Sequence, residues 1–257
     1  MPILEGKHIL VTGVLTDSSI AYAIAQLAQE EGAEVILSGA GRGLSLTKRT
    51  AKKLAKPAEV LEIDVTVPEQ LKSAATVVER LFGKLDGIVH AIAYAPPDCL
   101  GGNILKASWE SVATTLHVST YSLKALAESF QSLLKAAGSS SVVGLDFDAS
   151  AAWPAYDWMG VAKASLESLT RYLARDLGAQ QTRVNLIAAG PLRTIAAKSV
   201  PGFDQFEEVW RTRSPLDWRI TDATPVAKAC VALLSDWFPM TTGEIIHVDG
   251  GFHAMAI

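Results

Sequence analysis

Residues 8–38 read HILVTGVLTDSSIAYAIAQLAQEEGAEVILS, and they indicate the architecture of the whole chain. Residues 8–12 are a short apolar run, which predicts a buried strand that ends at Gly13. From Ile20 to Glu31 the apolar residues recur at helical spacing, and a glycine follows. Residues 34–38 are apolar again and predict a second buried strand. The chain thus opens with a strand, a helix and a strand.

The same alternation continues to the end of the chain. Further strands are expected at 59–63, 86–91, 141–145, 183–188 and 244–248, and helices at 44–55, 68–82, 108–137, 156–177 and 225–236. The strands are short, β-branched and apolar on both faces, which predicts a parallel sheet covered by helices on both sides. We therefore expect a single domain over residues 1–257, a Rossmann-like, doubly wound α/β fold with about seven parallel strands.

One long irregular segment interrupts this alternation, at residues 190–215. A long connection on the carboxyl side of the strands is typical of a binding lid, so we expect a substrate-binding segment there, with one or two short helices.

Composition excludes several classes of protein. The chain has 257 residues, of which 49% are hydrophobic, enough for a large core, and its net charge of -4 with dispersed Lys and Arg argues against a nucleic-acid partner. No apolar run is long enough to span a membrane, and the N-terminus does not resemble a signal peptide. Cys99 and Cys230 form no disulfide framework, and no Cys/His cluster has metal-ligand spacing. We expect a soluble, reduced, cytoplasmic protein without a metal site.

The first strand–helix turn is a candidate phosphate site, because ligands of doubly wound sheets bind at the carboxyl ends of the strands. The turn lacks the G-x-G-x-x-G pattern, since Gly13 is its only glycine, and a plain turn is the alternative. In the functional interpretation Gly13 lets the backbone approach a pyrophosphate, while Ser19 and the first amides of the helix face the anion.

Three more strand ends suit a dinucleotide. Asp64 and Val65 follow the third strand, where a carboxylate can accept a hydrogen bond from an adenine amino group. Residues 90–93 follow the fourth strand, and their small side chains allow close approach of a ribose. Residues 190–194 follow the sixth, where backbone groups can hold a nicotinamide amide. Each signal is weak alone, but four together predict a dinucleotide site.

Residues 147–163 read FDASAAWPAYDWMGVAK and contain the candidate reaction centre. Tyr156 and Lys163 are seven residues apart, so both can project from one helix face. A neighbouring ammonium would favour the phenolate and lower the pKa of Tyr156. Taken alone, the pair is better explained as a surface lysine and a half-buried tyrosine. Its position after the fifth strand, opposite the cofactor-facing strand ends, favours an active site.

These motifs together resemble the short-chain dehydrogenase/reductase superfamily, and within it the NADH-dependent enoyl-acyl-carrier-protein reductases of the actinobacterial, mycolate-pathway type. The resemblance covers Gly6 to His253 and rests on residues 13–21, 85–90, 144–148, 154–156 with Lys163, 188–194, 222–227, 233–237 and 248–251. It implies reduction of trans-2-enoyl thioesters, on acyl-carrier protein or CoA, in type II fatty-acid synthesis. It also implies a homotetramer.

The resemblance assigns roles to individual residues. Tyr156 would stabilise an enolate, Lys163 would hold the ribose hydroxyls, and Phe147 would pack near the thioester and the cofactor. Met159, one turn after Tyr156, is a candidate for the acyl pocket. The expected cofactor-binding residues are Gly13, Ser19, Ile20, Asp64, Val65, Ala91, Ile92, Ala93, Lys163, Leu192 and Thr194.

The residues before Tyr156 separate enoyl reduction from carbonyl reduction. Carbonyl reductases of the superfamily place a serine about a dozen residues before the tyrosine, whereas this chain has Val142, Val143 and Gly144 there. Ser150 is too close to the tyrosine to replace that serine. A β-ketoacyl or general carbonyl reductase remains the alternative enzyme. A catalytically silent dinucleotide-binding regulator is the alternative from another class, which the intact Tyr156 and Lys163 oppose.

Some positions depart from the family pattern. Ala91 and Ala93 stand where relatives often have Ser and Gly, and Ala40 stands where an aromatic residue stacks on adenine. Arg42 would favour NADPH if it met a 2′-phosphate. A solvated arginine is preferred, since similar NADH-dependent proteins carry one there, and so NADH is expected over NADPH. Segment 190–215 is shorter than in long-chain relatives, which predicts a shallower pocket and shorter acyl chains.

Overall fold

Seven parallel strands form one sheet in the computed structural model, which describes residues 2–256. The strand order is β3-β2-β1-β4-β5-β6-β7, and every neighbouring pair is parallel. The strands are β1 (His8–Val11), β2 (Glu34–Gly39), β3 (Glu59–Glu62), β4 (Gly87–His90), β5 (Ser140–Asp146), β6 (Thr182–Ala189) and β7 (Ile245–Val248). The predicted doubly wound α/β fold is confirmed.

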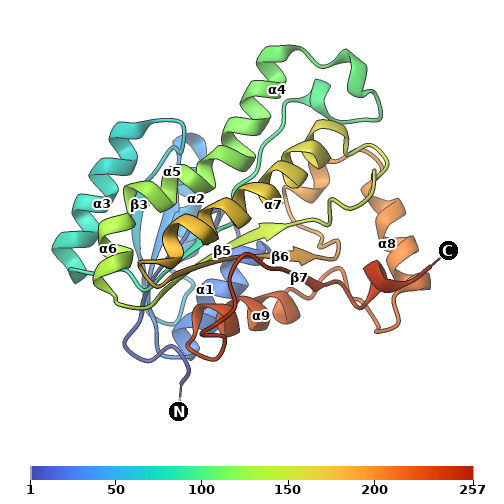
Figure 1. Cartoon of the computed structure of the whole chain (residues 1–257). Helices are drawn as coiled ribbons and strands as arrows, with labels where there is room; N and C mark the ends of the chain where they lie inside the picture. The colour runs from blue at the N-terminus through green and yellow to red at the C-terminus, as the bar shows by residue number, and fades with distance from the viewer. Residues whose placement is uncertain (1, 257) are drawn as a thin grey trace.

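Helices cover both faces of this sheet (Figure 1). One layer contains α1 (Ile20–Glu30), α2 (Gly41–Ala51) and α9 (Thr224–Leu234), and the other contains α3 (Pro68–Phe82), α5 (Ser122–Ser129), α6 (Gln131–Ala136) and α7 (Asp157–Gly178). Strand β1 shows why the strands are apolar throughout: Ile9 and Val11 enter the α1/α9 core, while Leu10 enters the α3/α5 core.

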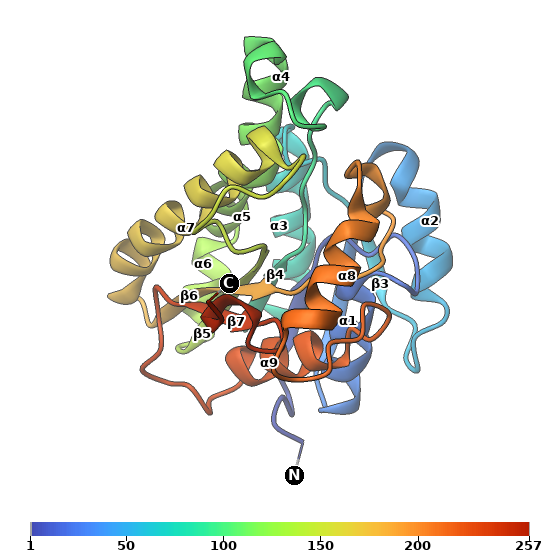
Figure 2. The ribbon, with the colours of Figure 1, turned by 90° about the vertical axis from the view of Figure 1, so that its right-hand side faces the viewer.

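The remaining helices extend beyond the sheet. They are α4 (Trp109–Leu116), α8 (Phe203–Arg213) and the short turns η1 (Pro97–Cys99), η2 (Ile104–Lys106), η4 (Ala197–Ser199) and η5 (Phe252–Ala254). Figure 2 looks toward the carboxyl ends of the strands, with α4 at the top and α8 in front. Segment 190–215 thus contains a short turn and an eleven-residue helix, as its sequence predicts.

The prediction at 108–137 is wrong in one respect: residues 109–136 are helical as expected, but a π-helical turn and Phe130 divide them into α4, α5 and α6. A π-helical turn, His117–Tyr121, lies between α4 and α5. Within it the Ser119 hydroxyl donates to the Tyr94 carbonyl (3.0 Å) and the Thr120 hydroxyl donates to the Ala162 carbonyl (2.8 Å). These two hydrogen bonds connect the turn to the loop after β4 and to α7. Because both partners are distant in sequence, the local pattern of residues does not reveal the turn.

The predicted bounds of α2 are also wrong, since the helix runs from Gly41 to Ala51 rather than 44–55. Ala40 is extended, and its carbonyl accepts from the Gly43 amide, so the helix starts at the end of β2. Within residues 2–256, no helix combines the length and apolar character that crossing a bilayer requires.

Candidate active site

The loops after β1 and β4 lie against each other at the point where the strand order reverses. The Thr12 hydroxyl donates to the Val89 carbonyl (2.9 Å) and accepts from the Ala91 amide (3.0 Å). Gly13 has a positive φ of 79°, and a Cβ there would overlap the Ala91 carbonyl. The glycine is therefore required by backbone packing, which leaves a narrow floor at the usual position for a dinucleotide.

The next two predicted cofactor residues flank this floor. Ser19 is the N-cap of α1: its hydroxyl accepts from the Tyr22 amide (3.3 Å) and donates to the Thr16 carbonyl (2.6 Å). Ile20 is the first residue of the helix, so the free amides of the first turn lie at the carboxyl edge.

Asp64 and Val65 lie farther away, directly after the edge strand β3. One Asp64 carboxyl oxygen accepts from both the amide and the hydroxyl of Thr66, which fixes the side chain, and Val65 is buried. Three strands lie between β3 and β5, which makes four inter-strand spacings of about 4.8 Å each. The end of β3 is therefore about 19 Å from the end of β5. A dinucleotide crosses the sheet edge in that direction.

The other predicted cofactor residues follow β4 and β6. Ala91 and Ile92 are half-buried and Ala93 is exposed, whereas Leu192 is buried and Thr194 is half-buried. Gly190 precedes the last two: a Cβ there would lie 2.7 Å from the Trp218 ring and 2.9 Å from the Trp210 indole nitrogen. The segment after β6 is thus held against the sheet by two tryptophans.

The backbone around Tyr156 is strained and held from outside. Ala155 and Asp157, on either side of Tyr156, have positive φ values of 58° and 39°. The Asp157 carboxylate accepts from the Gly102 amide (2.6 Å) and the Asn103 amide (3.1 Å). Backbone strain of this kind costs about 1–3 kcal/mol per residue and persists only where neighbours enforce it. Loop 101–103 therefore helps to set where the Tyr156 side chain lies.

Lys163 is buried in α7 and interacts with the end of β5. Its ammonium donates to the Leu145 carbonyl (2.7 Å) and lies 3.8 Å from the Asp146 carboxylate. Burial raises the pKa of Asp146 to about 7; the Lys163 charge opposes that rise and Glu167 adds to it. Burial lowers the pKa of Lys163, and Asp146 opposes that change.

The prediction that Lys163 lowers the pKa of Tyr156 is wrong for this structure. Burial raises that pKa, and the charge of Asp146 raises it further. Sequence spacing places Lys163 two turns along the helix from Tyr156, but it does not show the carboxylate between strand and helix. Tyr156 consequently remains a neutral phenol, which donates a hydrogen bond, throughout the physiological pH range.

Phe147 lies at the centre of an aromatic cluster that comes from distant parts of the chain. Its ring contacts Tyr156 edge-on, with centroids 5.3 Å apart, and lies 5.8 Å from both Phe206 and Trp210 of α8. Trp153 lies 5.1 Å from Phe147 and 5.3 Å from Trp210. Met159 is buried in the first turn of α7. Predicted lid and predicted reaction centre are thus in direct contact.

Sequence reasoning did not assign Asp146, Trp153, Phe206 or Trp210 to the site. The position of Asp146 could have indicated a site residue, because it lies at the carboxyl end of a buried strand, close to where the predicted cofactor residues lie on other strands. Phe206 and Trp210 are four residues apart on α8, which is helical spacing, but nothing local relates them to Phe147.

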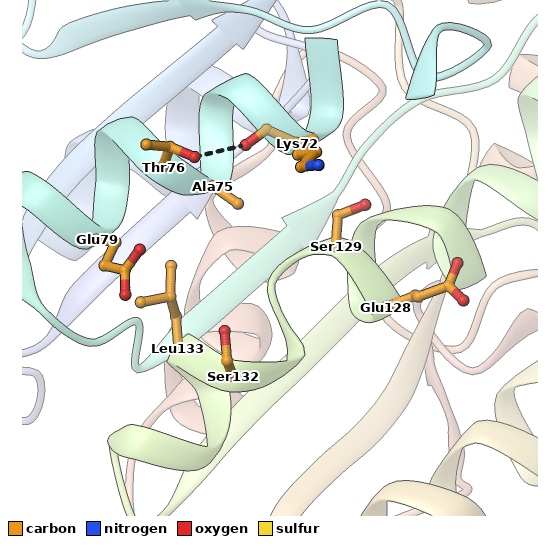
Figure 3. Close-up of a pocket in the computed structure, with 8 residues that line it drawn as sticks. All are labelled: Lys72, Ala75, Thr76, Glu79, Glu128, Ser129, Ser132 and Leu133. Atoms are coloured by element: carbon orange, nitrogen blue, oxygen red, sulfur yellow. Dashed lines mark hydrogen bonds between the residues drawn. The ribbon is translucent and has the colours of Figure 1, made fainter. Parts of the chain in front are cut away.

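A cavity of about 320 Å³ lies elsewhere, on the helical layer (Figure 3). It is lined by Lys72 to Glu79 of α3 and by Glu128 to Leu133 of α5 and α6. It contains none of the predicted site residues. The predicted site residues lie instead after β1, β3, β4, β5 and β6, at the carboxyl edge of the sheet.

A doubly wound parallel sheet with a tyrosine and a lysine seven residues apart after β5 defines a short-chain dehydrogenase/reductase. Residues 13–253 match the family model described as enoyl-(acyl carrier protein) reductase, and the chain belongs to that family. The family predicted from the sequence is thereby confirmed.

Individual relatives carry the same name. The chain is 46% identical over 263 residues to the enoyl-acyl-carrier-protein reductase (NADH) of Mycolicibacterium smegmatis, covering 97% of each chain. It is 44% identical to the corresponding Mycobacterium avium protein, again over 97% of each chain. Identity to the Aquifex aeolicus enzyme is 38%, over 100% of this chain and 95% of that protein. All three names specify NADH.

Proposed function

We propose that this protein reduces the C2–C3 double bond of trans-2-enoyl thioesters with NADH, in type II fatty-acid synthesis. The observation that carries the proposal is the edge-on contact between Phe147 and Tyr156 (5.3 Å). It places an apolar ring, rather than a second hydroxyl, beside the proton-donating phenol. Val142, Val143 and Gly144 are buried in β5 and have no hydroxyl group that could polarise a ketone. The Ser150 hydroxyl donates to Asp148 (2.8 Å) and does not take that role either.

The residues present fit a dinucleotide. The packed floor at Gly13 and the first turn of α1 suit the pyrophosphate, Asp64 and Val65 suit the adenine, and Lys163 suits the ribose hydroxyls. Ala91, Ile92, Ala93, Leu192 and Thr194 line the ribose and nicotinamide side. When bound, NADH supplies the hydride that reduces the β-carbon.

The protein's own groups stabilise the charge that then develops. As the β-carbon gains hydride, the electron pair of the double bond moves to the thioester oxygen and gives an enolate. Tyr156, kept neutral by its raised pKa, donates a hydrogen bond to that oxygen. Lys163 does not act on the tyrosine and keeps the ribose-binding role proposed above. The α-carbon then takes a proton from a water molecule, and the oxygen returns its electron pair to restore the carbonyl of the saturated thioester.

A substrate comparison tests the proposal. Purified protein is assayed for NADH oxidation with crotonyl-CoA and octenoyl-CoA, and with acetoacetyl-CoA as the carbonyl substrate. We expect turnover of both enoyl thioesters and not of the keto thioester, with NADPH the poorer reductant. Preference for acetoacetyl-CoA would establish the carbonyl reductase instead. NADH binding without turnover of any substrate would establish a regulator.

We further propose that segment 190–215 binds the acyl chain within a single reductase domain, and that the substrate is carried by acyl-carrier protein or by CoA. Phe206 and Trp210 occupy the space behind Phe147, which supports a preference for medium over long chains. Equal or better kcat/KM with long-chain enoyl thioesters contradicts this.

We also propose a cytoplasmic homotetramer. Large apolar side chains are exposed on α4, on the π-helical turn and on α7, notably Trp109 (71%), Tyr121 (50%) and Tyr172 (55%). Covering such residues favours self-association. Light scattering after gel filtration measures the assembly directly, and a monomeric mass contradicts it.

A further inference from the structure

Asp146 is the last residue of β5, and its side chain is fully buried. Neither carboxyl oxygen reaches hydrogen-bond geometry with any residue in the range 2–256. Burying a carboxyl group without a partner costs several kcal/mol in general, so such groups in folded proteins usually have a specific role.

The neighbour that gives Asp146 a role is Lys163. The Lys163 ammonium lies 3.8 Å from Asp146 Oδ1 and donates to the Leu145 carbonyl at 2.7 Å. Consecutive residues of β5 thus restrain the same ammonium, one by a hydrogen bond and the other by charge. A lysine has a flexible four-carbon stem, so two restraints on its head group define where it lies.

Other titratable groups surround this pair on several elements. Glu167, one turn after Lys163 on α7, accepts from the Ala149 amide (3.2 Å) and acts on Asp146. His90 at the end of β4 is buried and within the field of Lys163. Tyr156 lies within the field of Asp146. From β7, His247 approaches Asp148 rather than Asp146, at 3.9 Å.

We propose that Asp146 is a positioning residue that holds the Lys163 ammonium in place and, by its charge, keeps Lys163 protonated. An ionised Asp146 stabilises the ammonium that lies 3.8 Å away. Lys163 therefore keeps its proton to higher pH than it would beside a neutral residue. The inference rests on the role of Lys163 given under the proposed function.

Asp146→Asn removes the charge and keeps the shape, and its effect is measured through NADH binding. The dissociation constant is followed by nicotinamide fluorescence from pH 6 to pH 10, without an acyl substrate. We expect the pH at which NADH affinity falls to move down by about one unit, because Lys163 loses its counter-charge. The alkaline limb of the kcat profile should move in the same direction.

Two further variants complete the experiment. Asp146→Glu keeps the charge and should restore at least half of the shift. Asp148→Asn makes the same chemical change two residues away, at a carboxyl that lies near His247, and should leave the pH midpoint where it is in the wild type. A purely structural role for Asp146 lowers stability without moving the midpoint.

An unchanged midpoint in folded Asp146→Asn protein overturns the inference. If that variant does not fold, calorimetry of NADH binding to the wild type in two buffers of different ionisation enthalpy decides: proton exchange near pH 7 supports the inference, and its absence overturns it. Because NADH binding is measured without turnover, failure of the enoyl reductase activity is distinguishable from failure of this inference.

Discussion

The β1 and β4 loops and the aromatic cluster around Phe147 share the carboxyl edge of one sheet, but they are held in different ways. The two loops are joined through Thr12 and through backbone packing at Gly13. The cluster is held by side chains from the loop after β5, from α8 and from η5. A floor set by backbone tolerates few changes, whereas a wall made of side chains can be reshaped. The dinucleotide half is thus expected to be rigid and the acyl half adjustable.

Gly13→Ala should have the largest effect. The new Cβ meets the Ala91 carbonyl and also requires an unfavourable φ, so we expect a loss of about 4 kcal/mol in unfolding free energy and loss of NADH binding. Denaturant unfolding and NADH fluorescence measure the two. Gly102→Ala is the matched control, since Gly102 also has a positive φ (89°) but a Cβ there meets nothing within 4 Å. Equal losses in both variants would mean that strain alone matters.

Tyr156→Phe should follow, with kcat for an enoyl thioester lowered about 10²- to 10³-fold, because one hydrogen bond to the developing oxyanion is removed. The dissociation constant for NADH should not change. Tyr172→Phe, an exposed tyrosine on the same helix, controls for the loss of a hydroxyl. Wild-type kcat in Tyr156→Phe would remove the assigned role.

Phe206→Ala tests whether the acyl half is adjustable. Removing this ring from beside Phe147 lengthens the pocket, so kcat/KM for a long-chain enoyl thioester should rise about 10-fold relative to a medium-chain one. Phe203→Ala is the control, because the Phe203 ring lies 6.1 Å from Phe206 and is not among the rings that pack on Phe147. The same shift from both variants would show that α8 has simply loosened.

His90 should give the smallest effect, and it concerns stability. Its Nε2 donates to the Ser122 hydroxyl (2.7 Å), which itself donates to the Val118 carbonyl. Burial, with the Lys163 charge, lowers the pKa of His90 to about 3. The folded state therefore binds fewer protons than the unfolded state between about pH 6.5 and 3. Stability present above pH 6.5 is lost as the pH falls through this window.

Urea unfolding at pH 6.5 and pH 5.5 measures the contribution of His90 as a difference between two proteins, because the raised pKa of Asp146 acts in the opposite direction and in both of them. His90→Gln keeps a donor for Ser122 but does not titrate, so between these two pH values the wild type should lose about 1 kcal/mol relative to this variant. Parallel pH dependence in the two proteins contradicts a neutral, buried His90.

The sheet was predictable because each strand is short and apolar on both faces, a pattern that parallel sheets require. The strand-end residues were predictable for a related reason: once the order of strands is known, Gly13, Asp64 and Ala91 must lie at one edge. The interruption of the helix expected at 108–137 could not be predicted, because the π-helical turn depends on hydrogen bonds to Tyr94 and Ala162. The neighbours of Phe147 and the charge balance at Lys163 likewise depend on contacts between segments far apart in sequence.

The stacking of Trp210 on Phe252, with ring centroids 3.8 Å apart, has a practical consequence. The guanidinium of Arg213, the last residue of α8, lies over the same Phe252 ring, 4.8 Å from its centroid. Two residues of α8 thus contact the carboxyl-terminal segment of the chain. The amino end lies on another side of the molecule (Figure 1). Affinity tags, immobilisation linkers and reporter fusions therefore belong at the amino end. At the carboxyl end, the same additions would disturb α8, the helix that contacts Phe147.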